Sequence, residues 1–325
     1  MRILVTGASG FIGKNILTKW SLPVSKITAI YHETDLTDFC RERTLKHVAP
    51  VPCDLGSPED IGKLVEVHGG FYDLIIYLAA NGDPAKSASD PALDLEMNTK
   101  YLINLLEQIT CGKFIFFSSG AVYDKLKGPV TPGSALNPVL PYAVSKLASE
   151  RYIEFFSRHR KTINTYYLIR FFGAYGEFEP ERKIFRRLLE TFQNRSSADY
   201  PIKGNGLNLI DAMHAEDTVR ALEKIAESNK DSMTLDLASH DPLTVNQLVE
   251  KAASLCGCKV ELKHEGQAPE YIEFRTVDDT MKKEFGFVPE ISLETGLKWY
   301  IDQLERRKNC NGKKHGSSWE PVRQV

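Results

Sequence analysis

A glycine-rich turn near the N-terminus restricts the fold of this chain more than any other feature of its 325 residues. The segment TGASGFIG places Gly7, Gly10 and Gly13 at three-residue spacing, after the apolar run 2–7 and at the start of the amphipathic run 11–20. We expect Gly7 to turn the chain, Gly10 to admit a pyrophosphate, and Gly13 to let the helix approach the strand. The free N–H groups of the helix N-terminus then favour bound phosphates. The turn therefore predicts a dinucleotide site, and the alternative is a tight turn without a ligand.

The first half of the chain alternates short apolar runs with helical patterns. The apolar runs are rich in β-branched and aromatic residues, as expected of buried strands. They cover residues 2–7, 27–31, 47–55, 73–80, 113–119 and 164–172, and helical patterns cover 11–20, 57–67, 91–109 and 142–160. Strands that are apolar on both faces and alternate with helices indicate a parallel sheet covered on both sides. The predicted fold is an α/β doubly wound parallel sheet of the Rossmann type.

The pattern loosens after residue 175 and predicts a smaller α/β unit against the carboxyl edge of the sheet. Its helical patterns and short strands lie at 180–194, 214–228, 244–256, 292–307, 233–238 and 259–263. We divide the chain into a dinucleotide-binding domain, 1–175, and a smaller substrate-binding domain, 176–307. A segment near 206–232 is a candidate to return to the first domain. The polar, Gly/Ser/Lys-rich stretch 308–325 is typical of a flexible tail.

Composition and charge argue against several other classes of protein. The formal net charge of -2 gives no reason to expect nucleic acid or an anionic membrane as a partner. No apolar run reaches the ~18 residues of a membrane span, and the N-terminus lacks the order of a signal peptide. The cysteines are scattered, without a C-x-x-C pair: Cys40, Cys53, Cys111, Cys256, Cys258 and Cys310. These observations predict a cytoplasmic protein with reduced thiols and no metal.

The end of the second predicted strand leaves NAD and NADP as alternatives. NAD sites usually place an acid there, but AIYHETD has Tyr31 at that point, with Glu33 and Asp35 beyond it. Arg41 and Arg43 could serve a 2′-phosphate or could be solvated helix surface. The predicted cofactor is therefore NAD or NADP.

Two tyrosines have a lysine four residues further on, and their surroundings distinguish them. Tyr123 is followed by DKLKGP, and the Gly–Pro pair 128–129 breaks any helix before Lys127 could come onto the face of the tyrosine. Tyr142 instead begins the helical segment YAVSKLASERYIEFF, which brings Lys146 onto the same face. A tyrosine base at neutral pH needs its pKa to fall by about 3. An adjacent ammonium, the helix N-terminus and a cationic nicotinamide ring all lower that pKa.

Two serines complete this candidate site. Ser118 and Ser119 end the apolar run 113–119, at the strand end where doubly wound proteins bind ligands. Either hydroxyl could hold a reacting oxygen against the phenol of Tyr142. The alternative interpretation is structural: Tyr142 packs, Lys146 is solvated, and the serines cap a strand end.

These motifs together resemble the extended short-chain dehydrogenase/reductase superfamily, in particular its NAD-dependent epimerase/dehydratase family. The resemblance covers about residues 1–305 and rests on TGASGFIG, DLIIYLAA, SSGAVY, PYAVSK, RFFGAYG and DDTMKKEFGFVPEISLETGLKWY. It implies that Tyr142 is the catalytic acid/base, Lys146 its partner and Ser119 the hydroxyl contact. The cofactor contacts predicted from the turn and the resemblance are Gly7, Ser9, Gly10, Phe11, Ile12, Gly13, Asp54, Leu55, Leu78, Ala79, Ala80, Asn98, Ser118, Tyr142 and Lys146.

The resemblance implies a nucleoside-diphosphate sugar as substrate and hydride transfer at a ring carbon. The leading hypothesis is an NAD(P)-dependent epimerase, in which Tyr142 takes the hydroxyl proton and a transient keto-sugar receives the hydride back on its other face. One alternative is an NADPH-dependent reductase of a 4-keto-sugar nucleotide, and another is a non-enzymatic dinucleotide-binding sensor. The helices near 91–109 and 142–160 are similar to those that pair in a four-helix dimer contact, so a homodimer is expected.

Some residues depart from the family pattern. Gly120 and Ala121 stand where dehydratases carry Asp-Glu, which argues against a 4,6-dehydratase. Gly173 and Ile210 replace an Asn and an Arg that commonly hold the substrate diphosphate. Candidate replacements, each otherwise a surface charge, are Lys203, Arg182, Arg186, Arg187 and Arg275.

Polar residues also follow the third and fourth predicted strands. Asp54 is placed to accept a hydrogen bond from the adenine amino group or to cap a helix. Asn81, Asp83 and Lys86 could touch the sugar or serve as turn residues. The predicted substrate contacts are Asn81, Asp83, Lys86, Ser119, Phe172, Arg182 and Arg275.

Overall fold

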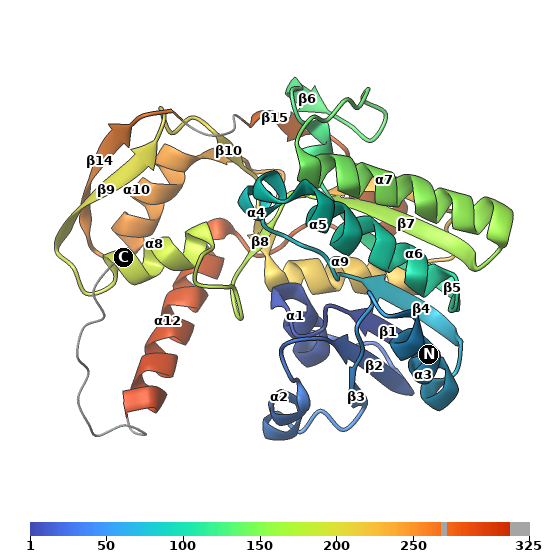
Figure 1. The fold of residues 1–325 in the computed structure, drawn as a ribbon. Coiled ribbons are helices and arrows are strands. Elements are labelled where there is room, and N and C mark those ends of the chain that lie inside the picture. The colour runs from blue at the N-terminus through green and yellow to red at the C-terminus, as the bar shows by residue number, and fades with distance from the viewer. Residues whose placement is uncertain (268–271, 313–325) are drawn as a thin grey trace.

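The main sheet of the computed structural model gathers the apolar runs of the first half of the chain. The structure describes residues 1–267 and 272–312, and within them seven strands form one sheet in the order β12-β7-β5-β4-β1-β2-β3. Every neighbouring pair in this sheet is parallel. The strands are β1 (Arg2–Thr6), β2 (Lys26–Tyr31), β3 (Val48–Pro52), β4 (Phe71–Tyr77), β5 (Thr110–Ser119), β7 (Ile163–Phe171) and β12 (Met233–Leu237). The predicted doubly wound parallel sheet is confirmed (Figure 1).

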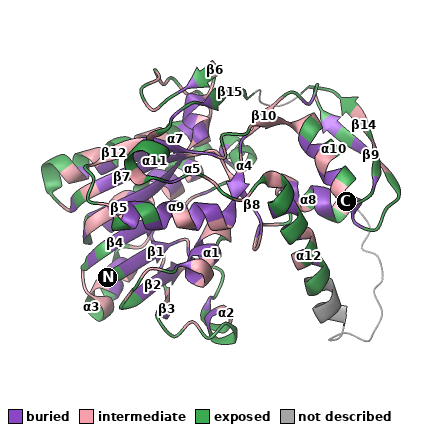
Figure 2. Ribbon diagram, turned by 180° about the vertical axis from the view of Figure 1, so that it is seen from behind, coloured by how far each residue is buried: buried purple, intermediate pink, exposed green. Residues whose placement is uncertain are grey.

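Helices cover both faces of the main sheet, because alternate side chains of a strand point to opposite faces. In β1, Ile3 and Val5 belong to the core under α1, α9 and α11, whereas Leu4 belongs to the core under α3, α6 and α7. The strands are buried between these layers (Figure 2). The helices are α1 (Phe11–Lys19), α3 (Pro58–His68), α6 (Tyr101–Leu106), α7 (Pro141–Phe155), α9 (Ala215–Glu227) and α11 (Thr280–Phe285).

Two long helical patterns of the sequence contain a π-helical turn. The run predicted at 91–109 is α5 (Pro91–Leu95), the π-helical segment Glu96–Lys100, and α6. The run predicted at 142–160 is α7 followed by the π-helical segment Phe156–Arg160. The short helices α2 (Thr37–Glu42) and α4 (Pro84–Ser89) were not predicted, because each is too short for an apolar period to appear.

A smaller unit lies beyond the carboxyl edge of the main sheet (Figure 1). Its core is formed by α8, α10 and α12 together with the parallel strand pair β9 and β14. Short strand pairs β8–β11, β10–β13 and β6–β15 lie outside the main sheet. The bounds are β6 (Lys127–Val130), β8 (Ala174–Tyr175), α8 (Ile184–Phe192), β9 (Ser197–Lys203), β10 (Leu209–Ile210), β11 (Met213–His214), β13 (Leu243–Thr244), α10 (Val245–Leu255), β14 (Lys259–Glu265), β15 (Glu273–Thr276) and α12 (Leu293–Gly312).

The chain returns to the main sheet after entering the smaller unit. Helix α9 packs on α1, and β12 pairs with β7, so the returning segment reaches Leu237 and extends past the predicted 206–232. At the other end, α12 continues to Gly312, five residues into the stretch predicted as a flexible tail. The remainder of that predicted tail, 313–325, lies outside the described residues. Within the described chain, no helix combines the length and apolarity that a membrane crossing requires.

Candidate active site

The glycine turn has close backbone contacts on its protein side. Gly7 has φ +62°, and a Cβ there would lie 2.9 Å from the backbone nitrogen of Ala79. A Cβ on Gly13 would lie 2.6 Å from the Cα of Ala8, so glycine is needed for α1 to lie this close to β1. A Cβ on Gly10 would meet the carbonyl oxygen of Gly7 at 3.1 Å and no other described atom outside its immediate neighbours within 4 Å. The turn therefore packs tightly against the protein at Gly7 and Gly13 and leaves space at Gly10. A phosphate that binds to the backbone needs this space.

The N-terminus of α1 presents its backbone N–H groups without a side-chain cap. Its N-cap is Gly10, and its first turn holds no acidic residue. By contrast, the side chains of Ser57 and Asp83 cap α3 and α4. Uncapped N–H groups and the helix dipole favour a bound anion. The residues of the turn therefore fit the pyrophosphate of a dinucleotide.

Two cavities follow the carboxyl edge of the sheet, and both reach Gly7 and Ala80. Their volumes are about 640 Å³ and about 270 Å³. The predicted cofactor contacts that line the larger one are Gly7, Gly10, Phe11, Ile12, Gly13, Leu78, Ala80, Ser118, Tyr142 and Lys146. Those that line the smaller one are Gly7, Ser9, Asp54, Leu55, Ala79 and Ala80. This arrangement fits a dinucleotide lying across the glycine turn.

Tyr142 and Ser119 meet at the wall of the larger cavity. Tyr142 is the second residue of α7, directly after Pro141 at the start of the helix. Burial raises the pKa of the Tyr142 phenol, a hydrogen bond with the Ser119 hydroxyl lowers it, and the Asp94 carboxylate raises it, with a net upward shift. The Ser119 oxygen also accepts a hydrogen bond from the backbone nitrogen of Ala121 at 3.1 Å. The protein groups therefore keep Tyr142 protonated at neutral pH, which differs from the lowered pKa that the sequence predicts.

Lys146 is buried one helical turn after Tyr142. Its ammonium donates to the carbonyl oxygen of Phe117 at 2.8 Å and lies 6.0 Å from the centre of the Tyr142 ring. Burial lowers the pKa of Lys146 to about 8, against the opposing effect of the Asp94 and Glu150 carboxylates. The shared helix face is as predicted, and the ammonium is held by the carbonyl oxygen of Phe117.

A buried polar network lies behind these residues, centred on Asp94. Its carboxylate accepts hydrogen bonds from the hydroxyl of Ser145 at 2.6 Å and the side-chain amide of Asn98 at 2.8 Å. Asn81 donates to the same carboxylate at 3.3 Å. Asn98, predicted as a cofactor contact, and Asn81, predicted as a substrate contact, therefore have their side-chain amides in this network and line neither cavity. Asp94 and Ser145 were missed, because no sequence pattern signals a buried acid at helical spacing.

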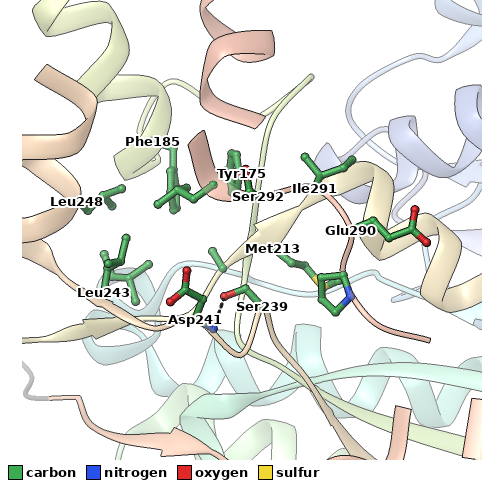
Figure 3. Close-up of a pocket in the computed structure, with 14 residues that line it drawn as sticks. Tyr175, Phe185, Met213, Ser239, Asp241, Leu243, Leu248, Glu290, Ile291 and Ser292 are labelled. Atoms are coloured by element: carbon green, nitrogen blue, oxygen red, sulfur yellow. Dashed lines mark hydrogen bonds between the residues drawn. The ribbon is translucent and has the colours of Figure 1, made fainter. Parts of the chain in front are cut away.

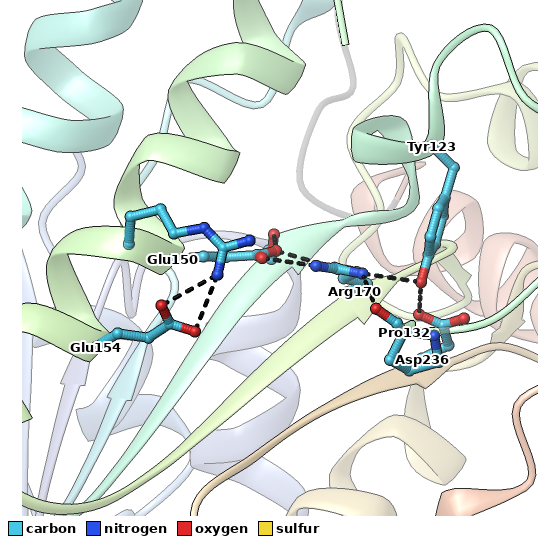
Figure 4. A network of polar contacts seen from close by, with 8 residues as sticks. Tyr123, Pro132, Glu150, Glu154, Arg170 and Asp236 are labelled. Atoms are coloured by element: carbon cyan, nitrogen blue, oxygen red, sulfur yellow. Dashed lines mark hydrogen bonds and ion pairs between the residues drawn. The ribbon is translucent and has the colours of Figure 1, made fainter. Parts of the chain in front are cut away.

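A second buried network joins Ser118 to Tyr123, the tyrosine of the other Y-x-x-x-K pair. Figure 4 shows its members Glu150, Arg170, Tyr123 and Asp236. The Ser118 hydroxyl donates to Glu150 at 2.5 Å, and Glu150 forms an ion pair with Arg170 at 2.9 Å. Arg170 donates to the hydroxyl of Tyr123 at 3.2 Å, and Tyr123 donates to Asp236 at 2.7 Å. Tyr123 is thus a buried hydrogen-bonding residue, and the prediction that it forms no helical pair with a lysine is confirmed.

The cations of the larger cavity are placed at the start of α8. Arg182 and Lys183 both line it, and Arg182 lies 3.6 Å from Asp83, whose side chain also caps α4. Burial lowers the pKa of Lys183, and the nearby Glu179 carboxyl opposes that shift. Lys183 was not among the predicted cations, although it is one of the four cations of the run ERKIFRR.

The remaining predicted substrate contacts and diphosphate-binding cations differ in whether they reach a cavity. Arg275 is exposed on β15 and lines neither cavity, and Arg186 is paired with Glu181 and Glu190. Lys86 lines the smaller cavity. Among the remaining substrate candidates, Phe172 lines the larger cavity.

Residues at and just after the end of β2 line the smaller cavity. Tyr31, His32 and Glu33 line it, as do Asp54 and Lys86. Arg41 and Arg43 do not line it: Arg41 pairs with Asp38 at 2.7 Å, and the Arg43 guanidinium lies 4.2 Å from the centre of the Phe39 ring. Neither arginine is therefore placed to meet a ribose phosphate in this cavity.

A third cavity of about 230 Å³ lies between the main sheet and the smaller unit (Figure 3). Phe185 and Leu248 form part of its apolar wall, and Ile210 and Ala212 also face it. Asp211, between these two, faces the larger cavity instead. Since alternate residues of an extended segment face opposite sides, this one segment separates the two cavities. The third cavity contains none of the predicted catalytic residues.

The doubly wound sheet, the glycine turn and the adjoining serine, tyrosine and lysine define an enzyme of the extended short-chain dehydrogenase/reductase type. The chain belongs to the NAD dependent epimerase/dehydratase family, whose model matches residues 3–235.

Individual relatives act on nucleotide sugars according to their names. The chain is 26% identical to a dTDP-glucose 4,6-dehydratase of Streptomyces niveus, over 93% of each protein. It is 25% identical to a putative UDP-glucose 4-epimerase of Methanocaldococcus jannaschii, over 93% of this chain and 98% of that protein. Its fold is similar to that of MoeE5 in complex with UDP-glucose and NAD, with a TM-score of 0.82 at 24% identity, over 95% of this chain and 100% of that one.

Proposed function

We propose that the chain is an NAD-dependent epimerase of a nucleoside-diphosphate sugar, acting through a transient keto-sugar. The observation that carries the proposal is the contact between the Ser119 and Tyr142 hydroxyls in a cavity that adjoins the glycine turn. The buried Lys146 and the cations Arg182 and Lys183 also line this cavity. A sugar with its diphosphate on those cations and one ring hydroxyl on Tyr142 matches this distribution of charge.

Each of these side chains has a role in the proposed reaction. When bound, the nicotinamide supplies hydride acceptance from a ring carbon and hydride return to it. Ser119 holds the reacting oxygen, and Tyr142 takes its proton and later gives it back. Lys146 contributes positive charge close to Tyr142. An epimerase needs no acid beside Ser119, and the ring of Phe172, 3.3 Å from a Cβ on Gly120, leaves little room for one.

The proposed cofactor is NAD in preference to NADP. Glu33 lines the smaller cavity, and a carboxylate there favours ribose hydroxyls over a 2′-phosphate. The two arginines that could have bound such a phosphate are engaged elsewhere.

The test is the substitution Tyr142→Phe, with Tyr152→Phe as the control on the exposed side of the same helix. UDP-glucose and dTDP-glucose, each with NAD, are assayed for C4 epimerisation by NMR. We expect Tyr142→Phe to lose at least about 100-fold in kcat, since a positioned acid/base contributes 10²–10⁴-fold. NAD affinity should stay nearly unchanged, and Tyr152→Phe should behave as wild type. Turnover by Tyr142→Phe at the wild-type rate would refute the proposal.

A second candidate function is the reduction of a 4-keto-sugar nucleotide. The raised pKa of Tyr142 favours it, because a protonated phenol is the form that donates to a keto oxygen. The two functions differ in cofactor balance. A reductase consumes one reduced nicotinamide per product, measurable as loss of absorbance at 340 nm, whereas an epimerase shows no net consumption.

We also propose a homodimer through α5 and α7. Apolar side chains that are about half exposed gather on these helices, namely Leu95, Val144, Tyr152 and Phe155. Exposed apolar patches of this kind mark association surfaces. Light scattering after gel filtration should give twice the chain mass of 36.6 kDa, and a mass of one chain would contradict the proposal.

A further inference from the structure

The larger cavity is lined by both charged and apolar residues. Its lining includes the cations Arg182 and Lys183 and the hydroxyl-bearing Ser119 and Tyr142, which form the proposed reaction centre. Next to the reaction centre the lining is apolar and consists of Gly120, Ala121, Leu140, Phe172 and Phe274. We call this lining the apolar wall.

The apolar wall is adjacent to the catalytic hydroxyls along the chain. Gly120 and Ala121 directly follow Ser119, and Leu140 precedes Tyr142 by two residues. The ring of Phe172 lies against Gly120, 3.3 Å from the position of a Cβ, and its centre is 6.1 Å from that of Phe274. The wall therefore forms one side of the space that a sugar ring occupies when its reacting oxygen is on Ser119 and Tyr142.

Asp124, an acid of this cavity that follows Ala121 by three residues, has both carboxylate oxygens in contact with other groups. Asp124 lines the larger cavity, but its side chain is only 9% exposed. One oxygen accepts from the backbone nitrogen of Val139 at 3.1 Å, and the other lies 3.6 Å from the ammonium of Lys125. Ser119 already accepts from Ala121. A sugar hydroxyl directed at this wall would thus meet aromatic and aliphatic carbon.

The orientation of the sugar decides which substituent meets the wall. With the anomeric carbon toward the cations and the carbon across the ring on Tyr142, one side of the ring carries hydroxyls and the other carries the exocyclic carbon. A buried hydroxyl without a partner is unfavourable, whereas a methyl group on an aromatic ring is favourable. We infer that the substrate is a 6-deoxy nucleotide sugar, with its methyl group on Phe172 and Leu140. This inference rests on the proposed function.

The experiment compares sugars that differ by this one hydroxyl. The probes are dTDP-glucose and dTDP-6-deoxyglucose, with the corresponding UDP pair. Their dissociation constants are measured by calorimetry on NAD-loaded Tyr142→Phe, which binds without turnover, and kcat/KM is measured on the wild type. We expect the 6-deoxy sugar of a pair to bind about 10- to 100-fold more tightly, since a hydrophobic pocket rejects an added hydroxyl by that factor.

Matched variants test the wall itself. Phe172→Gln and Phe172→Met have side chains of similar length and shape, but only Gln offers hydrogen-bonding groups. The Met variant should retain the preference, and the Gln variant should reduce it at least threefold. Ala121→Ser places a hydroxyl in the same wall and should act as the Gln variant does, which covers the case in which position 172 does not tolerate Gln.

The outcomes separate this inference from the proposed function. Equal or tighter binding of glucose in both pairs, with Tyr142-dependent turnover intact, overturns the 6-deoxy assignment alone. Failure of all four sugars to bind overturns the nucleotide-sugar substrate, and the 6-deoxy assignment with it. A preference for the 6-deoxy sugar that Phe172→Gln and Ala121→Ser leave unchanged also overturns the role of the wall.

Discussion

Replacement of Gly13 by alanine tests whether the glycine turn depends on close approach of a helix to a strand. The added Cβ would lie 2.6 Å from the Cα and carbonyl oxygen of Ala8 and 2.6 Å from the carbonyl oxygen of Gly7. All three are backbone atoms, so no side-chain rotation relieves the contact. Since carbon atoms pack at about 3.5–4 Å, the N-terminal turn of α1 must move from β1 by about 1 Å.

The stability change combines two opposing terms. Overpacking of this kind costs about 1–3 kcal/mol. Alanine in a helix interior gains about 0.8–1 kcal/mol over glycine. We therefore expect Gly13→Ala to lose about 0–2 kcal/mol of unfolding free energy, which is about 0–4 °C in Tm for a chain of this size. The same 1 Å movement displaces the N–H groups beside Gly10, so NAD affinity should fall at least about tenfold.

Gly62 provides the matched control in helix α3. A Cβ there would meet the side-chain oxygen of Gln108 at 3.6 Å, which is an ordinary contact. Gly62→Ala should therefore gain about 0.4–1 kcal/mol and leave NAD affinity unchanged. Urea unfolding and calorimetric titration with NAD measure both quantities. If Gly13→Ala binds NAD as tightly as wild type and gains as much stability as Gly62→Ala, the reasoning about close approach is refuted.

Three further predictions concern buried or cavity-lining charges. Burial raises the pKa of Glu179 from its ordinary 4.5 to about 8, so the folded state retains a proton that the unfolded chain releases, and stability falls as pH rises across that range. Glu179→Gln should match wild type in Tm at pH 4.5 and exceed it by at least ~2 °C at pH 8, and an equal Tm at both pH values would contradict this. We expect the protein to bind NAD about tenfold more tightly than NADP, because Glu33 repels a 2′-phosphate, and Glu33→Gln should narrow this ratio of affinities. Titration with both cofactors measures the ratio, and an unchanged ratio would exclude a role for that carboxylate. Arg170→Met leaves Glu150 buried without its partner and should lower the free energy of unfolding, measured in urea, by about 3–5 kcal/mol. The double variant Arg170→Met with Glu150→Met should recover most of that loss. If it recovers none, the broken ion pair is not the cause of the loss.

Local patterns with a strict geometric requirement were well predicted from the sequence. The glycine turn indicates its strand and helix directly, because glycine adopts the φ of Gly7 without strain and a Cβ at Gly7 or Gly13 would meet backbone atoms at 3 Å or less. The helix that carries Tyr142 and Lys146 follows from its apolar period and from Pro141 at its start. Doubly wound sheets bind their ligands at the carboxyl ends of the strands, and Ser119, at the end of β5, lines the same cavity.

Features that depend on contacts between distant parts of the chain could not be predicted from the sequence. Four side chains donate to the buried Asp94, and three of them, Asn81, Ser87 and Ser145, come from other segments of the chain. Asn98 looks like a ligand contact by position, but its amide is used by that carboxylate. The parallel pairing of β6 with β15 joins segments about 145 residues apart, which neither strand's composition specifies.

The order in which the chain visits its two parts has an evolutionary consequence. After β7 it enters the smaller unit through α8 and β9, returns for α9 and β12, leaves again for α10 and β14, and comes back for α11 before ending in α12. One cut in the gene therefore cannot exchange the region that surrounds the larger cavity. Diversification of this region must proceed by point substitution at the cavity or by recombination with several junctions, and a protease nick in a connecting segment should leave both fragments bound to each other.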